Sequence, residues 1–172
     1  MNLRIQKCSL IHLEELIKTS RTTFVEAFEK QNNPEDFKNY IDFAFDKEKL
    51  SSELVNPNSH FYFVYDNLSL LGYFKLNEGD TQTDIKENAS LELERIYVLQ
   101  EFQGNKIGEW LLGQIIELGV KLDKKYIWLG VWEQNSKAIT FYQRNGFSKF
   151  DTHPYYIGKD KQTDWLMRLD LK

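Results

Sequence analysis

Two carboxylates in the middle of the chain are the first candidates for chemistry. Glu92 and Glu94 alternate with Leu91 and Leu93, and this pattern predicts a strand whose two carboxylates share one face. A carboxylate in this position could accept the proton of an amine, directly or through a water molecule. Both side chains could equally be solvated residues on a strand that buries only its other face.

A turn with a glycine near each end follows this strand. It reads Gln103-Gly-Asn-Lys-Ile-Gly108, and after it the hydrophobic period changes from that of a strand to that of a helix. A helix N-terminus offers N–H groups without intrahelical partners and a partial positive charge, and glycines let a ligand approach the backbone. These properties suit a pyrophosphate group. An ordinary strand-to-helix turn would show the same residues, because short glycine motifs are common.

The chain then repeats the order of strand, turn and helix. Residues 126–132 form an apolar run typical of a strand, and Asn135 can cap the helix that follows. Gly146 stands where a left-handed C-terminal cap is expected, and hydrophobic Phe147 follows it. Tyr142 lies on the apolar face of this helix. By itself it would be taken for a packing residue.

Together, Gln-x-x-x-x-Gly at 103–108 and Asn-x-x-Ala-x-x-Phe-Tyr-x-x-x-Gly-Phe at 135–147 resemble the acetyl-CoA-binding core of the GNAT N-acetyltransferase superfamily. Both motifs occur in the family's order and at a usual separation. Over nearly the whole chain the sequence is also similar to bacterial spermidine/spermine acetyltransferases of the PaiA type. The further segments that carry this similarity are Thr23-Phe24, Gln31 to Glu35, Ile127 to Glu133 and Gln162 to Asp164.

The resemblance implies that acetyl-CoA is the co-substrate and that the turn amides bind its pyrophosphate. It also implies that the backbone of Ile96 and Val98 pairs with the pantetheine arm, and that the Val98 N–H stabilises the oxyanion. Lys106 replaces a glycine usual in the family, and we expect its charge to attract the phosphates rather than its bulk to exclude them. The residues expected to bind CoA are Ile96, Tyr97, Val98, Gln103, Gly104, Asn105, Lys106, Ile107, Gly108, Asn135, Lys137, Tyr142 and Arg144.

Three of the residues expected to bind CoA could also have an ordinary structural role. Asn135 can cap its helix and contact the cofactor at the same time. Lys137 and Arg144 could be ordinary solvated charges on the helix surface.

The same resemblance assigns the catalytic groups for a direct transfer without a covalent acetyl-enzyme. A phenol with an unperturbed pKa of about 10 stays protonated at neutral pH, so Tyr142 can donate a proton to the departing thiolate. Glu94 precedes Val98 by four residues, where some family members, including polyamine acetyltransferases, carry their base. Glu94 is therefore preferred to Glu92 as the proton acceptor.

The acceptor amine is expected to enter opposite CoA, over the first helices and the final hairpin. Acidic and aromatic side chains occur in both segments and would suit a long flexible polycation such as spermidine or spermine. The expected lining residues are Phe24, Glu26, Phe28, Glu29, Tyr155, Tyr156 and Asp164. The alternatives are another small amine, a protein α-amine, or a non-catalytic protein that senses acyl-CoA.

The order of elements predicts one domain, residues 1–172, of the α/β class with the GNAT fold: a mixed central sheet flanked by helices. Helices are expected to fill the first third of the chain, before a hairpin at 60–76 and a polar loop at 78–88. A second hairpin is expected at 150–171, about a turn at 158–161. The resemblance further implies that the middle strands splay apart to admit the pantetheine arm.

Composition limits the partners and the compartment. The net charge of −4 argues against a nucleic-acid partner, and no apolar run suggests a membrane span or a signal peptide, so we expect a cytoplasmic protein. Cys8 is the only cysteine and the three histidines are scattered, which gives no indication of a metal. The expected partners are an amine substrate and, as an open question, a second copy in a homodimer.

Overall fold

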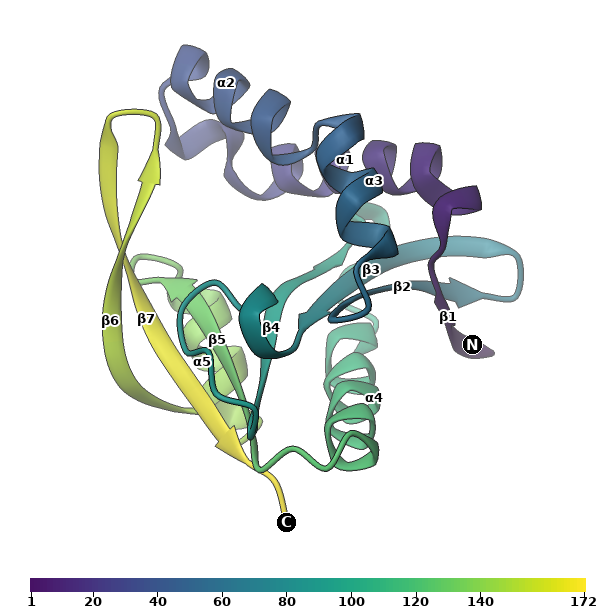
Figure 1. The fold of residues 1–172 in the computed structure, drawn as a ribbon. Coiled ribbons are helices and arrows are strands. Elements are labelled where there is room, and N and C mark those ends of the chain that lie inside the picture. Colours follow the sequence, from purple (N-terminus) through teal and green to yellow (C-terminus); the bar gives the residue numbers. More distant parts are fainter.

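The computed structural model describes residues 1–172 and contains one seven-stranded sheet with helices on both faces (Figure 1). The strands are β1 (Leu3–Lys7), β2 (Ser59–Asp66), β3 (Ser69–Asn77), β4 (Ser90–Val98), β5 (Tyr126–Trp132), β6 (Ser148–Ile157) and β7 (Asp160–Asp170). The helices are α1 (Leu13–Phe28), α2 (Pro34–Ala44), α3 (Lys47–Val55), α4 (Ile107–Lys121) and α5 (Ser136–Arg144). None of them is long and apolar enough to cross a membrane.

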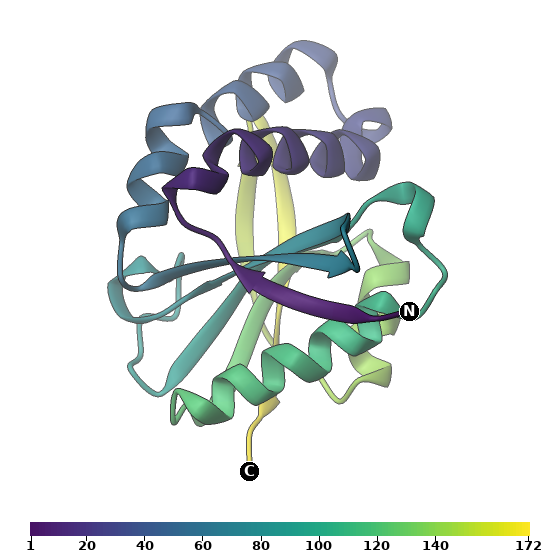
Figure 2. The ribbon, with the colours of Figure 1, turned by 90° about the vertical axis from the view of Figure 1, so that its right-hand side faces the viewer.

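The strands run in the order β1-β2-β3-β4-β5-β7-β6, and only β4 and β5 pair in parallel. The mixed α/β sheet expected from the sequence is therefore confirmed. Helices α1 to α3 pack on one face, against residues such as Phe61 and Tyr73, while α4 and α5 pack on the other, against residues such as Phe74 and Leu93 (Figure 2). The sheet thus has a hydrophobic core on each side.

Local signals explain why the first helices begin where they do. The Asn33 side chain accepts hydrogen bonds from the N–H groups of Glu35 (3.0 Å) and Asp36 (3.2 Å) at the start of α2. The Asp46 side chain accepts one from the N–H of Lys49 (3.1 Å) at the start of α3. Both caps are local signals, because each depends on residues within one helical turn.

Strands β4 and β5 separate soon after they begin. Their pairing stops at Glu92 and Trp128, whereas β3 accompanies β4 to Val98 and β7 accompanies β5 to Trp132. The carboxyl half of β4 therefore has a free edge toward β5, and the expected splay is confirmed. This opening in the sheet is the feature around which the site is built.

A β-bulge in β4 changes which side chains share a face. Lys75 of β3 pairs with Arg95, but the next residue of β3 pairs with Leu93, so Glu94 is the extra residue. Because a bulge opposes two residues to one, Glu94 and Arg95 both point toward α1 to α3 instead of alternating. In a strand without a bulge, two consecutive residues would point to opposite faces.

The segment between β3 and β4, predicted as a polar loop, is anchored by a buried amide. Gln82 is buried, and its carbonyl oxygen accepts hydrogen bonds from Trp128 Nε1 and Ser90 Oγ, each at 2.7 Å. The next residue, Thr83, donates its backbone N–H to the Glu92 carboxylate at 2.8 Å. This loop consequently seals the start of the β4–β5 pair.

The final hairpin is longer than predicted. Strands β6 and β7 extend to a tight turn in which Gly158 has φ +59°, so the turn is shorter than the expected segment 158–161. The tip of the hairpin reaches α2 (Figure 1), where the hydroxyls of Tyr155 and Tyr40 share a hydrogen bond. The hairpin and α2 therefore border the opening between β4 and β5 on the same side.

Candidate active site

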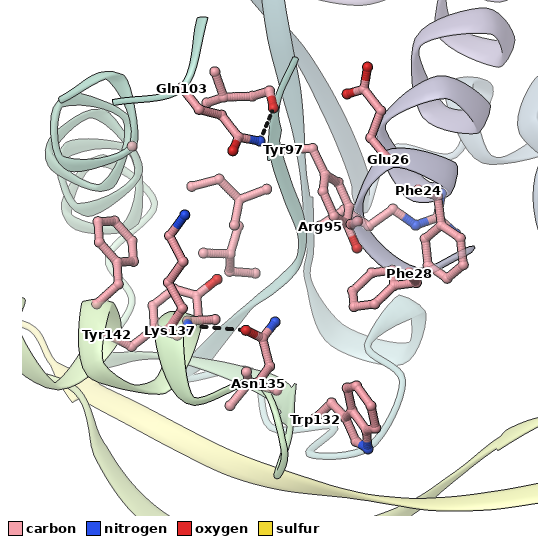
Figure 3. Close-up of a pocket in the computed structure, with 18 of the residues that line it drawn as sticks. Phe24, Glu26, Phe28, Arg95, Tyr97, Gln103, Trp132, Asn135, Lys137 and Tyr142 are labelled. Atoms are coloured by element: carbon pink, nitrogen blue, oxygen red, sulfur yellow. Dashed lines mark hydrogen bonds between the residues drawn. The ribbon is translucent and has the colours of Figure 1, made fainter. Parts of the chain in front are cut away.

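A cleft of about 770 Å³ lies where β4 and β5 diverge. It is lined by α1, β4, the turn before α4, the end of β5, α5 and the β6–β7 hairpin. In Figure 3, Tyr142 and Lys137 of α5 lie on one side of β4, while Phe24, Glu26 and Phe28 of α1 lie on the other. The cleft thus has two sides of different composition.

The backbone of the turn before α4 has a conformation that lets a ligand approach it closely. Gly104 has φ +84°, and Lys106 has φ +58° in the left-handed region, which glycine adopts without steric cost. A glycine at position 106 would adopt this conformation without strain, and lysine there costs about 1 kcal/mol. A side chain at Gly108 would lie 3.3 Å from the Phe141 ring, so glycine also lets α4 approach α5.

The free edge of β4 presents the backbone of Ile96 and Val98 to the cleft. The Leu99 N–H donates to the Leu71 carbonyl (2.9 Å), and because hydrogen-bonding direction alternates along an antiparallel pair, Ile96 and Val98 point away from β3. Gln103 Nε2 donates to the Val98 carbonyl oxygen at 3.0 Å and so ties the turn to the strand. The Val98 N–H remains directed to the open side, as the oxyanion assignment requires.

Most residues expected to bind CoA line this cleft, but three do so differently or not at all. The Tyr97 backbone faces β3, so only its ring contributes, on the α1 side. Asn105 is outside the lining, and its side chain donates to the Phe102 carbonyl (3.0 Å). Arg144 is exposed near the end of α5, also outside the lining. The side chains of Asn105 and Arg144 thus lie outside the cleft, because a spacing along a helix or strand does not determine where each side chain points.

Helix α5 brings its N-terminus and Tyr142 to the cleft. Asn135 accepts a hydrogen bond from the Ala138 N–H at 3.2 Å, and Lys137 lines the cleft one turn before Tyr142 (Figure 3). The Tyr142 side chain is buried, makes no hydrogen bond with the protein, and has its pKa raised by burial. Its hydroxyl therefore stays protonated and has a donor to offer.

Glu94 lines the cleft but is neutralised by its neighbours. Its Oε2 lies 2.6 Å from Lys75 Nζ and 2.6 Å from Asn77 Nδ2, and its Oε1 lies 3.4 Å from Arg95 Nη2. Burial alone would raise the pKa of Glu94, but the charges of Arg95 and Lys75 hold it at about 2. A carboxylate held so firmly in its ionised form is a weak base.

Glu92 is enclosed and does not line the cleft. Its carboxylate accepts hydrogen bonds from Asn77 Nδ2 (2.9 Å), from the Thr83 N–H (2.8 Å) and from the Thr83 hydroxyl. Burial and the nearby charge of Glu94 raise its pKa. A raised pKa would suit a base, but the 78–88 loop covers the Glu92 carboxylate. Neither carboxylate thus combines access to the cleft with basicity.

The α1 side of the cleft is aromatic. Phe24 and Phe28 have ring centroids 4.8 Å apart, and both lie edge-on to Tyr97 at 6.5 and 6.4 Å. Glu26 projects from the same helix (Figure 3), and its carboxylate accepts a hydrogen bond from the Gln100 N–H at 3.1 Å. Tyr155 and Asp164 complete this side from the hairpin.

Two residues expected on the acceptor side lie elsewhere. Glu29 is exposed beyond the end of α1, and Tyr156 points to the opposite side of β6 from Tyr155, because side chains alternate along a strand. Arg95 and Trp132 are among the lining residues that were not anticipated. The bulge brings Arg95 to this face, and no pattern in the sequence indicates it.

These features define an acyltransferase fold whose opened sheet can accept a cofactor arm, and comparison with known proteins identifies the family. The chain belongs to the Acetyltransferase (GNAT) family, whose sequence model matches residues 13–147. It is an acetyl-CoA-dependent N-acetyltransferase. The free edge of β4 and the N-terminus of α4 fit the pantetheine and pyrophosphate of this co-substrate.

Similar proteins carry related names. An uncharacterised N-acetyltransferase of Lactobacillus delbrueckii subsp. lactis is 37% identical over 165 residues, covering 96% of this chain and 95% of its own. A spermidine N(1)-acetyltransferase of Thermoplasma acidophilum is 30% identical over 156 residues, covering 88% and 92%. The crystal structure of a PaiA N-acetyltransferase from Thermoplasma acidophilum in complex with coenzyme A superposes with a TM-score of 0.79 at 26% identity, covering 99% of both chains.

Proposed function

We propose that this enzyme transfers the acetyl group of acetyl-CoA directly to a primary amino group of a polyamine such as spermidine or spermine. The observation that carries the proposal is the composition of the acceptor side of the cleft. The rings of Phe24, Phe28 and Tyr97 line the same cleft as the carboxylates of Glu26 and Asp164, neither of which forms an ion pair with a cationic side chain. Methylene segments suit the rings, and ammonium groups suit both rings and carboxylates.

The charge balance of this side supports an acceptor with more than one positive charge. Arg95 is the cation on this side of the cleft, and Glu94 neutralises it. The carboxylates of Glu26 and Asp164 therefore leave a net negative field, which attracts a polycation more strongly than a single amine. The similarity to a spermidine N(1)-acetyltransferase is consistent with this acceptor.

The proposal assigns a chemical role to each of these groups, and their places in the cleft support it. Tyr142 donates its hydroxyl proton to the thiolate that leaves, and the Val98 N–H donates to the oxygen on which negative charge develops. Lys106, Lys137 and the N–H groups of the turn between Gln103 and Gly108 hold the phosphates. No side chain forms a covalent acetyl intermediate, because each of these groups only donates hydrogen bonds or charge.

The test is a panel of acceptors, with release of CoA as the assay. We expect kcat/KM for spermidine or spermine to exceed that for lysine, an aminoglycoside or a peptide α-amine, and to fall with added salt because salt screens the carboxylates. Glu26→Gln should lower kcat/KM for the polyamine. Glu29→Gln is the matched control, since Glu29 lies just beyond the same helix but outside the cleft. A clear preference for a peptide or an aminoglycoside would overturn the polyamine assignment.

A further inference from the structure

Asp164 occupies a position on β7 that gives its carboxylate access to the cleft. It pairs with Trp132 of β5, and its Oδ2 lies against Gly130, where a Cβ atom would be only 3.3 Å away. Gly130, Trp132 and Asp164 all line the cleft, at the end of β5 that has separated from β4. Because Gly130 has no side chain, the carboxylate can lie directly against its backbone.

Unlike Glu92 and Glu94, Asp164 has no partner. Its half-buried carboxylate accepts no hydrogen bond from the protein and forms no ion pair. Glu94 is held by two cations, and Glu92 is enclosed by Asn77 and Thr83. Among the acidic groups on the acceptor side, only Asp164 is buried enough to be desolvated yet free to take a proton.

We infer that Asp164 is the proton acceptor for the incoming amine, an assignment that rests on the proposed function. One proton moves from the ammonium nitrogen to the Asp164 carboxylate and later passes to solvent. The nitrogen lone pair that this exposes forms the C–N bond to the acetyl carbonyl carbon, and the C–S bond breaks. Tyr142 supplies the proton that the thiolate gains. The nitrogen loses its second proton as the amide forms, and this proton returns through solvent to the Tyr142 oxygen, so that both side chains are restored.

The surroundings of Asp164 support this role. Burial raises its pKa to about 6, the nearby charge of His153 on β6 lowers it, and that of Glu133 after β5 raises it. His153 itself faces Asp84, at 3.5 Å. The remaining titratable neighbours are the linked hydroxyls of Tyr40 on α2 and Tyr155 on β6, and the paired Glu94 and Arg95 across the cleft.

The pKa of Asp164 also distinguishes this residue from Glu94. Each step of one in pKa is a factor of ten in proton affinity, so Asp164, with a pKa of about 6, binds a proton about 10⁴ times more tightly than Glu94, with a pKa of about 2. At neutral pH Asp164 is ionised and ready to accept. Its pKa is also close enough to the working pH for efficient proton transfer.

The pH dependence of catalysis tests the assignment. Asp164→Asn should lower kcat for the preferred amine by about a hundredfold or more at pH 7. In the wild-type plot of kcat against pH, activity should fall below about pH 6 as Asp164 becomes protonated, and the variant should lack this acidic limb. The deficit should shrink near pH 10, where about half of the amine is neutral without help. Glu133→Gln, outside this cleft, should retain kcat at pH 8 and move the limb to lower pH, because its charge raises the pKa of Asp164. An Asp164→Asn enzyme with the wild-type limb, or a deficit equal at all pH values, would overturn the assignment.

Thermal unfolding gives a readout that needs no substrate. The pKa of Asp164 is higher in the folded protein than the ordinary 3.8, so wild type loses stability from this group as the pH rises from about 4 to about 6. Asp164→Asn lacks this loss, and its Tm relative to wild type should rise over the same range. A constant Tm difference would contradict the inference. If instead no amine in the panel releases CoA while the Tm difference rises, the proposed function fails and the titration of Asp164 stands.

Discussion

Replacing Glu94 with glutamine should destabilise the protein severely, because the carboxylate belongs to a buried network of charges. Lys75 Nζ lies 2.6 Å from Glu94 and 2.9 Å from Glu53, and Arg95 Nη2 lies 3.4 Å from Glu94. The side chains of Lys75, Arg95 and Glu94 are only 5%, 10% and 19% exposed. Glu94→Gln keeps the shape of the residue but leaves two buried cations facing one carboxylate.

The pKa of Glu94 gives the size of the expected loss of stability. The change from the ordinary 4.5 to about 2 corresponds to about 3 kcal/mol of stability. Removing one partner of a buried ion pair typically costs about 3 to 5 kcal/mol, so the two values agree. For a domain of this size the loss corresponds to a Tm about 6 to 12 °C lower. Because the folded-state pKa is depressed, this stability is fully present above pH 4.5 and disappears as the pH falls through about 2.

Urea unfolding followed by circular dichroism at pH 7 measures this loss. Glu48→Gln is the matched control, because Glu48 is an exposed residue of α3 without an ion pair, and it should change the stability by less than about 0.5 kcal/mol. Adding Lys75→Met to Glu94→Gln should restore part of the loss, since one excess charge is removed. A loss below about 1 kcal/mol for Glu94→Gln would refute the description of Glu94 as a tightly paired carboxylate.

Three further substitutions test the cleft and the loop before β4. Acetyl-CoA at about 100 times its Kd should stabilise the protein by about 2.7 kcal/mol in a thermal shift assay. Lys106→Glu should remove most of this gain and Lys121→Glu, at the far end of α4, should not; equal shifts for both would place Lys106 away from the phosphates. Tyr142→Phe should lower turnover about a hundredfold in steady-state assays while the Kd of acetyl-CoA is nearly unchanged, and near-normal turnover would make Tyr142 a packing residue. Gln82→Ala should cost about 1 to 3 kcal/mol in urea unfolding, because the buried Trp128 Nε1 loses its acceptor; a negligible cost would mean that the loop is not anchored there.

The sequence predicted most of the elements because their signals are local. Asn33 and Pro34 determine the start of α2 within one turn, and the change of hydrophobic period at Lys106 determines that of α4. The open edge of β4 followed from family resemblance instead. Nothing in the spacing of residues 91–98 shows that β5 departs after Trp128.

The site was predicted less completely, because its charges depend on contacts between distant segments. The bulge that places Glu94 beside Arg95 arises from the register between β3 and β4. Lys75 lies about twenty residues before Glu94, yet together with Arg95 it lowers the pKa of Glu94 and so makes Glu94 a weak base. Asp164 was expected only as an acceptor-binding residue, because its freedom from partners and the space above Gly130 appear only in three dimensions.

The most direct measurement of the central claim is identification of the product formed from acetyl-CoA and spermidine. We predict that mass spectrometry and NMR will show one acetyl group on a primary amino nitrogen of spermidine, with one CoA released for each acetyl group transferred. Wild-type enzyme that leaves spermidine unmodified, while it acetylates a peptide α-amine or an aminoglycoside, would contradict the polyamine assignment.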